Sequence, residues 1–536
     1  MSLMYRKAAQ MLQKCSHGRG IKGVLFEKED QSLKKLYAVV HKCLQDLNIL
    51  HRLYKVHLSK VCKNKYLGIV LLCELVQRKK IDGGGKLKRE VMKREKEILQ
   101  LYNDLKEEEN RKQSNDISQS KIQTKYFTIY EEGNIIAEEL KRTLEIEKDE
   151  DVEMLYKINS KNVKKLIDSS FYKQDKIRII DKTSCLVVQS GNIKKGMVIV
   201  DVCSSPGSKA IFSLFYLNKK GYLICIEKDR KRCYTLLKEI LKNNEYVGLY
   251  TDDNFSDKNK FELNENNFFS KKKDLHVYYI KHIDNELTIK IYNCDFFSLS
   301  SKDFSPFHSI DVVFIDPSCS SSGMPDFALK EKMRSAFYST GGSGSGEGSG
   351  SGEGSGSGEG SGSGEGSGSG EGSGRGEESR SGDVVELANA RGGEVAPSVK
   401  EDIDAVVETK RKKVRNANYN MYSDIARGVI PQVPATLTRK VKRLSDFQKK
   451  ILNHALVNLK TAKTFIYSTC SFFEEENEQV VENALQENQN LCLENAGKEK
   501  FLFRSGKYIF SDKCVRTFPE KHSCRGIFVS RICRTG

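Results

Sequence analysis

The sequence predicts an α/β fold with a Rossmann-like, mostly parallel sheet that is covered by helices and preceded by a small helical domain. Short runs rich in β-branched residues alternate with helical stretches from about residue 125 to residue 534, which is the pattern of parallel strands joined by helices. Several of these runs end in an acidic residue or lead to a cysteine. The first hundred residues instead place apolar residues three and four apart, as amphipathic helices do.

Six runs are predicted to be strands of one sheet, because each is rich in the β-branched and aromatic residues that favour a strand. They are MVIVDV (197–202), YLICIE (222–227), TIKIYNC (288–294), VVFIDP (312–317), TFIYST (464–469) and IFVSRICR (527–534).

The α/β region is predicted to be interrupted twice. The predicted parts of the chain are a helical domain (1–106), a linker (107–124), the first part of the α/β domain (125–338), a disordered insertion (339–420) and the remainder of the α/β domain (421–536). The disorder is predicted from a repeated SGSGEG motif that cannot bury a core. A further stretch at 252–274 is rich in Asn, Lys and Asp, which predicts a solvated insertion.

The chain is basic, and this favours an anionic partner. Lysine and arginine total 89 against 72 acidic residues, for a net charge of +17. Because polyanions release counterions when they meet such residues, nucleic acid is the first candidate. A run KRKKVR at 410–415 resembles a nuclear import signal, and a solvated charge run is the equally weighted alternative.

The cysteine pattern and the apolar runs exclude other classes of protein. The 15 cysteines include no C-x-x-C pair, so neither a zinc module nor a disulfide scaffold is indicated, and a reducing compartment is expected. The longest apolar run, at about 66–76, is too short to cross a bilayer, and no secretory signal is expected. The stretch DGGGK (82–86) lacks the spacing and the Ser or Thr of a phosphate loop, so we interpret it as a helix connection.

The first strand is followed by DVCSSPGSKA (201–210), a turn of small residues into a helix. The first amides of such a helix can receive a carboxylate or a phosphate. The next strand ends at Glu227, where an acid can accept hydrogen bonds from both ribose hydroxyls of an adenosine-type cofactor. Asp295 follows the third strand. Since G-x-G-x-x-G is missing, S-adenosylmethionine fits this pattern better than a dinucleotide, and solvated strand-end acids are the alternative.

Two further strands each present a cysteine just past their carboxyl end, Cys319 in FIDPSCSSSGMP and Cys470 in YSTCS. Ser471 and Glu474 have the spacing of a capping box, which predicts that a helix begins at Ser471. Cys470 would then lie at the positive end of that helix, where its thiolate is favoured. A buried structural cysteine is the alternative interpretation.

These motifs resemble those of the Sun (Fmu-like) family of S-adenosylmethionine-dependent RNA cytosine-5 methyltransferases. The family's D-x-C-A-A-P-G-x-K-T is similar to 201–210, with Ala210 in place of the threonine. DPPCSGSG is similar to 316–323, with Ser318 and Ser321 as substitutions. YSTCS recurs at 467–471, and the closing family motif resembles 516–530, with Arg525 in place of an aspartate.

The resemblance extends to both ends of the chain and is closest to the branch that methylates large-subunit ribosomal RNA. The segments that carry it include MYRKAAQML, DGGGK, DKTSCL, FQKKILNHAL and EEENEQVV. A family R-V-N-T-type strand has only a poor match in TKYFTIYEE (124–132). The usual glutamine before the DKTSCL aspartate is replaced by Ile180.

The resemblance implies a covalent mechanism and assigns its residues. Cys470 would attack carbon 6 of cytosine, which makes carbon 5 nucleophilic. Asp316 would hydrogen-bond the ring nitrogen and amino group, and Cys319 would assist removal of the carbon 5 proton or elimination of the enzyme. The converse assignment, with Cys319 as the attacking residue, is the arrangement of DNA cytosine methyltransferases.

The resemblance also implies the cofactor contacts and the biological setting. The residues expected around S-adenosylmethionine are Cys203, Ser204, Ser205, Pro206, Gly207, Ser208, Lys209, Glu227, Arg232, Asp295 and Asp316, with a solvated helix arginine as the alternative for Arg232. The partner is expected to be ribosomal RNA held by a monomer without metal or membrane, in the nucleus and more narrowly the nucleolus. The target cytosine must be single-stranded or flipped. Transfer RNA is the alternative substrate, and a non-catalytic RNA-binding assembly factor the alternative function.

Overall fold

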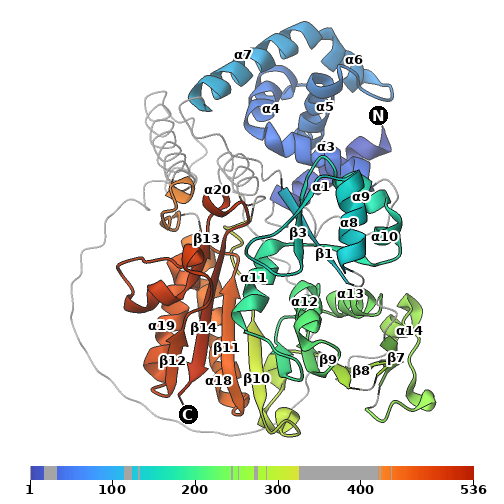
Figure 1. The fold of residues 1–536 in the computed structure, drawn as a ribbon. Coiled ribbons are helices and arrows are strands. Elements are labelled where there is room, and N and C mark those ends of the chain that lie inside the picture. Colours follow the sequence, from blue (N-terminus) through green and yellow to red (C-terminus); the bar gives the residue numbers. More distant parts are fainter. Residues whose placement is uncertain are drawn as a thin grey trace, which may run out of the picture.

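The computed structural model describes residues 2–16, 33–113, 124–130, 133–242, 246–251, 253–270, 276–284, 286–324, 327, 421, 424–435 and 437–535 (Figure 1). The SGSGEG repeat and the KRKKVR run lie outside these residues, as does the insertion predicted for 339–420. In the described part of the chain, no helix combines the length and apolarity that a bilayer crossing needs.

The N-terminal region is helical, as predicted, and it buries a core of its own. Its elements are α1 (Leu3–Ser16), α3 (Leu33–Gln45), α4 (Leu47–Leu53), the π-helical turn η1 (Tyr54–Leu58), α5 (Lys65–Arg78), α6 (Lys86–Lys93) and α7 (Glu95–Gln113). The side chain of Asn64 caps α5 by accepting a hydrogen bond from the Leu67 amide, which satisfies one of the unpaired amides of the first turn. The DGGGK stretch connects α5 to α6. Because α7 continues to Gln113, it covers the beginning of the predicted linker.

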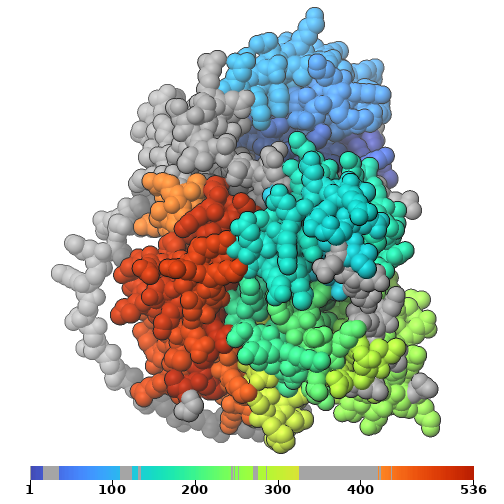
Figure 2. All heavy atoms as spheres, viewed as in Figure 1, coloured from blue at the N-terminus to red at the C-terminus, as the bar shows by residue number. Residues whose placement is uncertain are grey.

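A small antiparallel sheet follows, which the sequence analysis did not predict as a separate unit. Its strands are β1 (Thr124–Ile129), β2 (Ile146–Lys148), β3 (Leu155–Asn159) and β4 (Ile177–Ile180), in the order β2-β3-β1-β4, with the helices α8 (Gly133–Thr143), α9 (Val163–Asp168) and α10 (Ser170–Lys173). TKYFTI is its central strand β1. Figure 2 shows this unit in cyan below the blue N-terminal helices.

The large sheet confirms the predicted fold class. It contains β5 (Val198–Asp201), β6 (Gly221–Ile226), β7 (Tyr246–Tyr250), β8 (His276–His282), β9 (Leu287–Asn293), β10 (Ile310–Ile315), β11 (Ala462–Thr469), β12 (Leu491–Glu494), β13 (Val515–Thr517) and β14 (Ile527–Arg534). All six predicted strands are present. The order is β12-β14-β11-β10-β5-β6-β9-β8-β7, and the five strands from β11 to β9 are parallel. The strand β14 is antiparallel to β11.

Helices cover both faces of this sheet. The helices are α11 (Lys182–Ser190), α12 (Ser208–Leu217), α13 (Arg230–Ile240), α14 (Glu265–Ser270), α18 (Thr438–Asn458), α19 (Glu478–Glu487) and α20 (Pro519–His522), and the short 3₁₀ turns are η2 (Asp257–Asn259), η3 (Phe296–Ser298), η4 (Ser301–Phe304), η5 (Glu474–Glu476), η6 (Glu499–Phe501) and η7 (Ile509–Lys513). Ile199 and Val200, adjacent in β5, belong to different apolar clusters, because successive strand side chains point to opposite faces. The first cluster packs under α11, α12 and α13, and the second under α18 and α19.

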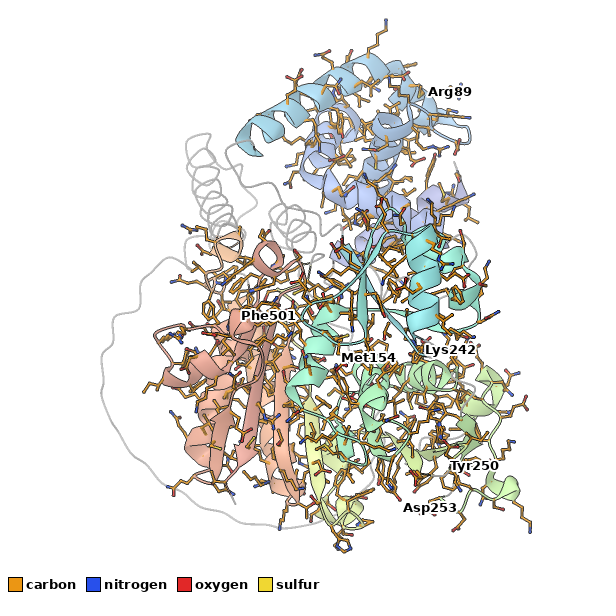
Figure 3. The ribbon with its side chains drawn as sticks, viewed as in Figure 1. Arg89, Met154, Lys242, Tyr250, Asp253 and Phe501 are labelled. Carbon is orange, nitrogen blue, oxygen red and sulfur yellow. The ribbon has the colours of Figure 1, made fainter. Side chains whose placement is uncertain are left out.

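Order within the sheet identifies its functional edge. The strand β5 has β6 on one side and β10 on the other, so the winding direction reverses there. Ligands of such sheets bind outside the carboxyl ends of the strands at this reversal. Figure 3 shows Phe501 at the border between the C-terminal part of the chain and the segment that contains α11.

The prediction of a solvated insertion at 252–274 is wrong for part of that segment. Phe268 in α14 is fully buried, and its ring stacks on Tyr278 of β8 at a centroid distance of 5.7 Å. The polar composition of the segment concealed this anchor, because a single buried aromatic side chain is enough to dock a six-residue helix.

A buried ion pair links the C-terminal strands to α19. Arg516 in β13 and Glu478 in α19 are each 1% exposed, and Arg516 Nε donates to Glu478 Oε1 at 2.7 Å. Arg516 also donates to the carbonyl of Phe472 at 3.1 Å. Since removal of one partner leaves a buried charge unpaired, this pair constrains the segment that follows β11.

We expect Glu478→Gln to lower the free energy of unfolding by about 3 kcal/mol or more, because the substitution leaves the Arg516 guanidinium without its countercharge. Urea denaturation of both proteins measures the loss. Glu482→Gln, a less buried position of the same helix, is the matched control and should change stability by less than about 0.5 kcal/mol. Equal losses in the two variants would contradict the assignment.

Candidate active site

The predicted site residues meet at the carboxyl edge of the sheet. Asp201 is the last residue of β5, and Glu227 follows β6 directly. Asp316 follows β10 and Cys470 follows β11. Four neighbouring parallel strands therefore bring these side chains to one edge of the sheet, as the topology requires.

The turn from β5 into α12 depends on a glycine. Gly207 has φ +108° at the position before α12, a conformation that L side chains rarely adopt. A Cβ atom there would lie 2.8 Å from the Leu236 side chain. Within the turn, the Ser204 hydroxyl donates to the Asp201 carbonyl at 2.8 Å. The backbone of the turn is thus held close to α13.

Asp201 is a buried acid with no partner. Its side chain is fully buried, and neither carboxylate oxygen accepts a hydrogen bond within the described residues. Burial raises the pKa of Asp201 to about 6, and the Lys209 ammonium opposes that rise. An unpaired buried carboxylate at a strand end fits a cationic ligand group.

Glu227 and Arg232 connect the second strand to the turn. The buried Glu227 accepts a hydrogen bond from the Asp229 amide at 2.9 Å. Arg232 lies 3.5 Å from the other Glu227 oxygen and also donates to the Ser205 carbonyl. Burial raises the pKa of Glu227. These bonds favour a role for Arg232 in the turn over the solvated alternative.

Asp295 takes a more peripheral position than the other strand-end acids. It caps η3 by accepting from the Phe297 amide at 3.1 Å. Its other oxygen lies 2.6 Å from the Lys228 ammonium. The side chain remains 38% exposed, so it can exchange the lysine for a ligand.

Lys209 and Asp316 form an ion pair that joins the turn to the cysteine loops. Lys209 Nζ lies 2.6 Å from Asp316 Oδ2. Burial alone would lower the pKa of Lys209, but the carboxylates of Asp316 and Asp201 raise it above its usual range. The lysine therefore stays charged and fixes the orientation of the Asp316 carboxylate.

The structure brings the two predicted cysteines into contact. The Sγ atoms of Cys319 and Cys470 lie 3.1 Å apart, and both residues are partly buried. The hydrogen bond from Cys319 lowers the pKa of Cys470, while that bond and burial raise the pKa of Cys319. The pair therefore favours a thiolate at Cys470 and a thiol at Cys319.

The predicted helix start at Ser471 is wrong. Residues 471–473 are irregular, Glu474–Glu476 form the 3₁₀ turn η5, and α19 begins only at Glu478. The Ser471 hydroxyl donates to Glu476 at 2.6 Å instead of capping a helix with Glu474. The lower pKa of Cys470 is consequently caused by the neighbouring thiol and not by a helix terminus.

Sequence reasoning missed the polar residues beneath the two thiols. These are Ser320, Ser322, Gln448, Ser471 and Glu476, all buried and hydrogen-bonded to one another. Three consecutive glutamates at 474–476 gave no indication that only the third is fully buried. The resemblance to the family of FQKKILNHAL, which contains Gln448, and of EEENEQVV, which contains Glu476, was the available signal.

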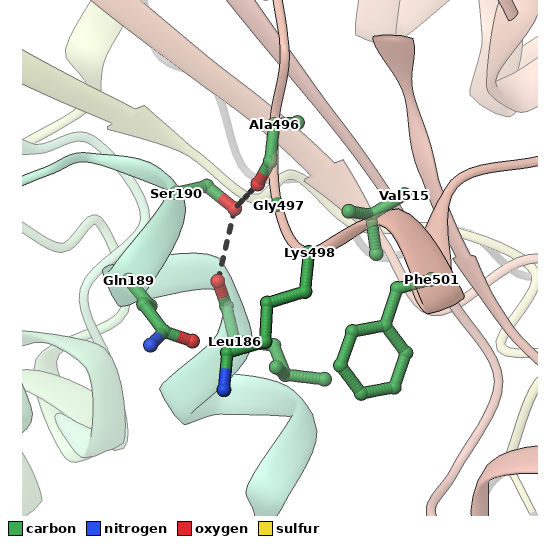
Figure 4. A pocket seen from close by; sticks show the side chains of 8 residues that line it. All are labelled: Leu186, Gln189, Ser190, Ala496, Gly497, Lys498, Phe501 and Val515. Carbon is green, nitrogen blue, oxygen red and sulfur yellow. Dashed lines mark hydrogen bonds between the residues drawn. The ribbon is translucent and has the colours of Figure 1, made fainter. Parts of the chain in front are cut away.

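A cavity of about 270 Å³ lies elsewhere, between α11 and the segment around η6 (Figure 4). Its lining includes Leu186, Lys498, Phe501 and Val515, and the Ser190 hydroxyl bridges the Leu186 and Ala496 carbonyls there. None of its lining residues belongs to the predicted site. Among the residues that the structure describes, no group of three or more His, Cys, Asp or Glu side chains is arranged to hold a metal ion.

We expect Asp201→Asn to stabilise the unliganded protein in a pH-dependent way. The native state binds the Asp201 proton more tightly than the unfolded state does, since the pKa rises from 3.8 to about 6. Wild-type stability therefore falls as pH rises from about 4 to about 6. The advantage of the variant should grow over this window to about 3 kcal/mol, and urea denaturation at pH 4, 5, 6 and 7 measures it. A pH-independent difference, or the same trend in the surface control Asp446→Asn, would contradict the assignment.

Comparison with known proteins supports the resemblance. The sequence model of the 16S rRNA methyltransferase RsmB/F family matches residues 426–533. The 26S rRNA (cytosine-C(5))-methyltransferase nsun-5 of Caenorhabditis elegans is 37% identical over 95 residues, which are 17% of this chain and 21% of the relative. The 28S rRNA (cytosine-C(5))-methyltransferase of Mus musculus is 33% identical over 92 residues, which are 17% of this chain and 20% of the relative. The chain thus matches about a fifth of the length of these relatives.

The fold has a counterpart among solved structures. The crystal structure of the protein PH0851 aligns over the full length of both chains with a TM-score of 0.50 and 13% sequence identity, and this likeness concerns the fold alone. The family match includes α18, β11 with Cys470, α19 and most of β14. Residues 426–533 are thus similar to the RsmB/F rRNA methyltransferase family, in agreement with the resemblance seen in the sequence.

Proposed function

We propose that this protein transfers a methyl group from S-adenosylmethionine to carbon 5 of a cytosine in large-subunit ribosomal RNA. The observation that carries the proposal is the contact between Cys319 and Cys470 at 3.1 Å, beside the carboxylate of Asp316. One thiol of such a pair can attack the base while the other holds a proton. The relatives that are named as 26S and 28S rRNA methyltransferases favour the large subunit over transfer RNA.

The residues at the strand ends fit the cofactor. The unpaired Asp201 carboxylate and the amides of the turn at 203–209 suit an amino acid group, which carries an ammonium and a carboxylate. The buried Glu227 suits the two ribose hydroxyls, and Asp295 suits the adenine amino group. When bound, S-adenosylmethionine supplies an electrophilic methyl group.

The chain's own side chains would perform the remaining chemistry. The Cys470 thiolate adds to carbon 6 of cytosine, so that carbon 5 becomes nucleophilic. Asp316, fixed by Lys209, accepts a hydrogen bond from the amino group of the base. After methylation, the carbon 5 proton passes to water, its C–H electron pair restores the ring double bond, and the bond between carbon 6 and sulfur breaks with its pair on Cys470. The Cys319 thiol assists this elimination by donating a hydrogen bond to the departing thiolate. The pKa directions of the two thiols favour this division over the converse one.

The departures from the family motifs are accommodated, which favours an enzyme over a non-catalytic assembly factor. Arg525, where the family has an aspartate, pairs with Asp181 at 2.7 Å. Ser321, where the family has a glycine, adopts φ +63°, and its hydroxyl contributes to the lower pKa of Cys470. Neither substitution removes a group that the chemistry needs.

The RNA backbone would lie along the N-terminal half of α18. Gln448 of this helix donates to the Ser318 carbonyl at 3.0 Å, so the turns before it project beyond the sheet edge beside the thiols. Arg439, Lys442 and Arg443 are exposed there, and the structure assigns them no ion pair within the described residues. The helical N-terminal region would hold RNA further from the base. A ribosomal RNA substrate also favours action in the nucleus, and more narrowly in the nucleolus.

We expect Cys470→Ala to abolish transfer of a labelled methyl group to ribosomal RNA, because no nucleophile then reaches carbon 6. Cys319→Ala should instead accumulate a covalent RNA–protein adduct that is visible as a slower band on a denaturing gel, since elimination stalls. Cys492→Ala, another partly buried cysteine, is the control and should keep wild-type activity. An adduct in Cys470→Ala would reverse the two assignments.

A nucleotide-resolution methylcytosine map in cells with and without the protein distinguishes ribosomal from transfer RNA.

We expect the triple variant Arg439→Glu, Lys442→Glu, Arg443→Glu to weaken RNA binding because three phosphate contacts are lost. The slope of log affinity against log salt should become shallower by about 2 for single-stranded RNA. Filter binding at several salt concentrations measures the slope. The matched control reverses Lys194, Lys195 and Lys460, which are exposed and precede β5 and β11 at the opposite edge of the sheet. A control slope that changes as much would show that only net charge matters.

A further inference from the structure

Glu476 is a fully buried carboxylate that accepts hydrogen bonds from three different segments. Its Oε1 accepts from the Ser320 amide at 2.8 Å and from the Gln448 side chain at 3.0 Å. Its Oε2 accepts from the Ser471 hydroxyl at 2.6 Å. All three partners are donors, so both carboxylate oxygens have hydrogen-bond partners at this buried position.

The three segments that meet at Glu476 include both cysteine loops. Ser320 is the neighbour of Cys319 in the chain, and Ser471 is the neighbour of Cys470. Gln448 belongs to α18 and also donates to the Ser318 carbonyl on the other side of Cys319. Each thiol is therefore one residue away from a hydrogen bond to the same carboxylate.

Other hydrogen bonds also join the two cysteine loops, but none of them includes Gln448, and none joins the residue next to Cys319 to a carboxylate. The hydroxyls of Ser320, Ser322 and Ser471 lie within 3.1 to 3.3 Å of one another. The Gly323 amide donates to the Cys470 carbonyl at 2.9 Å, but Gly323 is four residues from Cys319. The Tyr467 hydroxyl donates to the Glu476 carbonyl at 2.6 Å, which fixes the backbone of η5 to β11.

We propose that Glu476 is a positioning residue that holds the loop after β10 and the loop after β11 together, so that the thiols of Cys319 and Cys470 face each other. Its consequence for catalysis rests on the proposed function, whereas the contact between the thiols does not. Without the carboxylate, the Ser320 amide and the Gln448 side chain lose their common acceptor. Each loop is then free to relax, and a displacement of 1 Å is enough to separate the thiols.

The test measures the coupling between the thiols directly, without cofactor or RNA. Alkylation of Cys470 by iodoacetamide is followed by mass spectrometry as a function of pH, in otherwise wild-type protein and in Cys319→Ala. Because the Cys319 thiol stabilises the Cys470 thiolate, Cys319→Ala should raise the midpoint of alkylation by about one pH unit. The same comparison is made in Glu476→Ala and in Glu475→Gln, a partly exposed neighbour in η5 that serves as the matched control.

In Glu476→Ala, we expect Cys319→Ala to leave the Cys470 midpoint unchanged, whereas the shift should persist in Glu475→Gln. Glu476→Gln keeps one acceptor and the size of the side chain, so it should retain part of the shift, and it serves where the alanine variant fails to fold. A full shift in Glu476→Ala, or equal loss in Glu475→Gln, would overturn the proposal. No shift in the wild-type background would overturn it as well, since the thiols would then not interact.

Methyl transfer provides the separate readout that links positioning to catalysis. Glu476→Ala should reduce kcat by about 100-fold with little change in KM for RNA, and Glu475→Gln should stay within about twofold of wild type. If Glu476→Ala loses the coupling between the thiols but the wild-type protein transfers no methyl group, the proposed function is refuted and the positioning role remains. If the wild-type enzyme is active and Glu476→Ala keeps the coupling between the thiols, the positioning role alone is refuted.

Discussion

The register between β10 and β11 is the constraint on which the site depends. Ile315 pairs with Tyr467 in parallel alignment, so the two strands end at the same height. Cys319 then follows four residues after Ile315, and Cys470 three residues after Tyr467. A slip of one residue would turn every side chain of a strand to the opposite face. The apolar residues on both faces of the sheet therefore also fix the position of the thiols.

A layer of buried polar groups holds the two loops that follow these strands, so that the Cys319 and Cys470 thiols are in contact. Serine hydroxyls, Gln448 and the Glu476 carboxylate occupy the space between the strand ends and the thiols. The pair between Arg516 and Glu478 holds the following segment. Buried charges are costly unless they are fully paired, and a satisfied network tolerates few alternative arrangements. The loops after β10 and β11 are for this reason more restricted in conformation than loops usually are.

The strands and the two cysteines could be predicted because their signals are local. A run such as MVIVDV carries its own propensity, and a cysteine after such a run must lie at the carboxyl edge. The small antiparallel sheet was harder to predict, since β2 has only three residues and β4 only four, and β1 pairs with β3 and β4, which lie far along the chain from it. The start of α19 was mispredicted because Ser471 is hydrogen-bonded by the buried Glu476, and this tertiary contact outweighs the local capping pattern.

The turn at 203–209, where we propose that the cofactor binds, is connected to the thiols through an ion pair. Lys209 belongs to the first turn of α12, while Asp316 precedes Cys319 by three residues. Their contact at 2.6 Å joins α12 to the loop after β10, and Glu476 joins that loop to the one after β11. A displacement at the turn is consequently transmitted to the thiols through fixed bonds. The opposite pKa directions of Cys319 and Cys470 arise within this frame, because only one of two thiols in contact can readily lose its proton. Alignment of the methyl donor, the base and the nucleophile would thus follow from the folded core without a separate rearrangement.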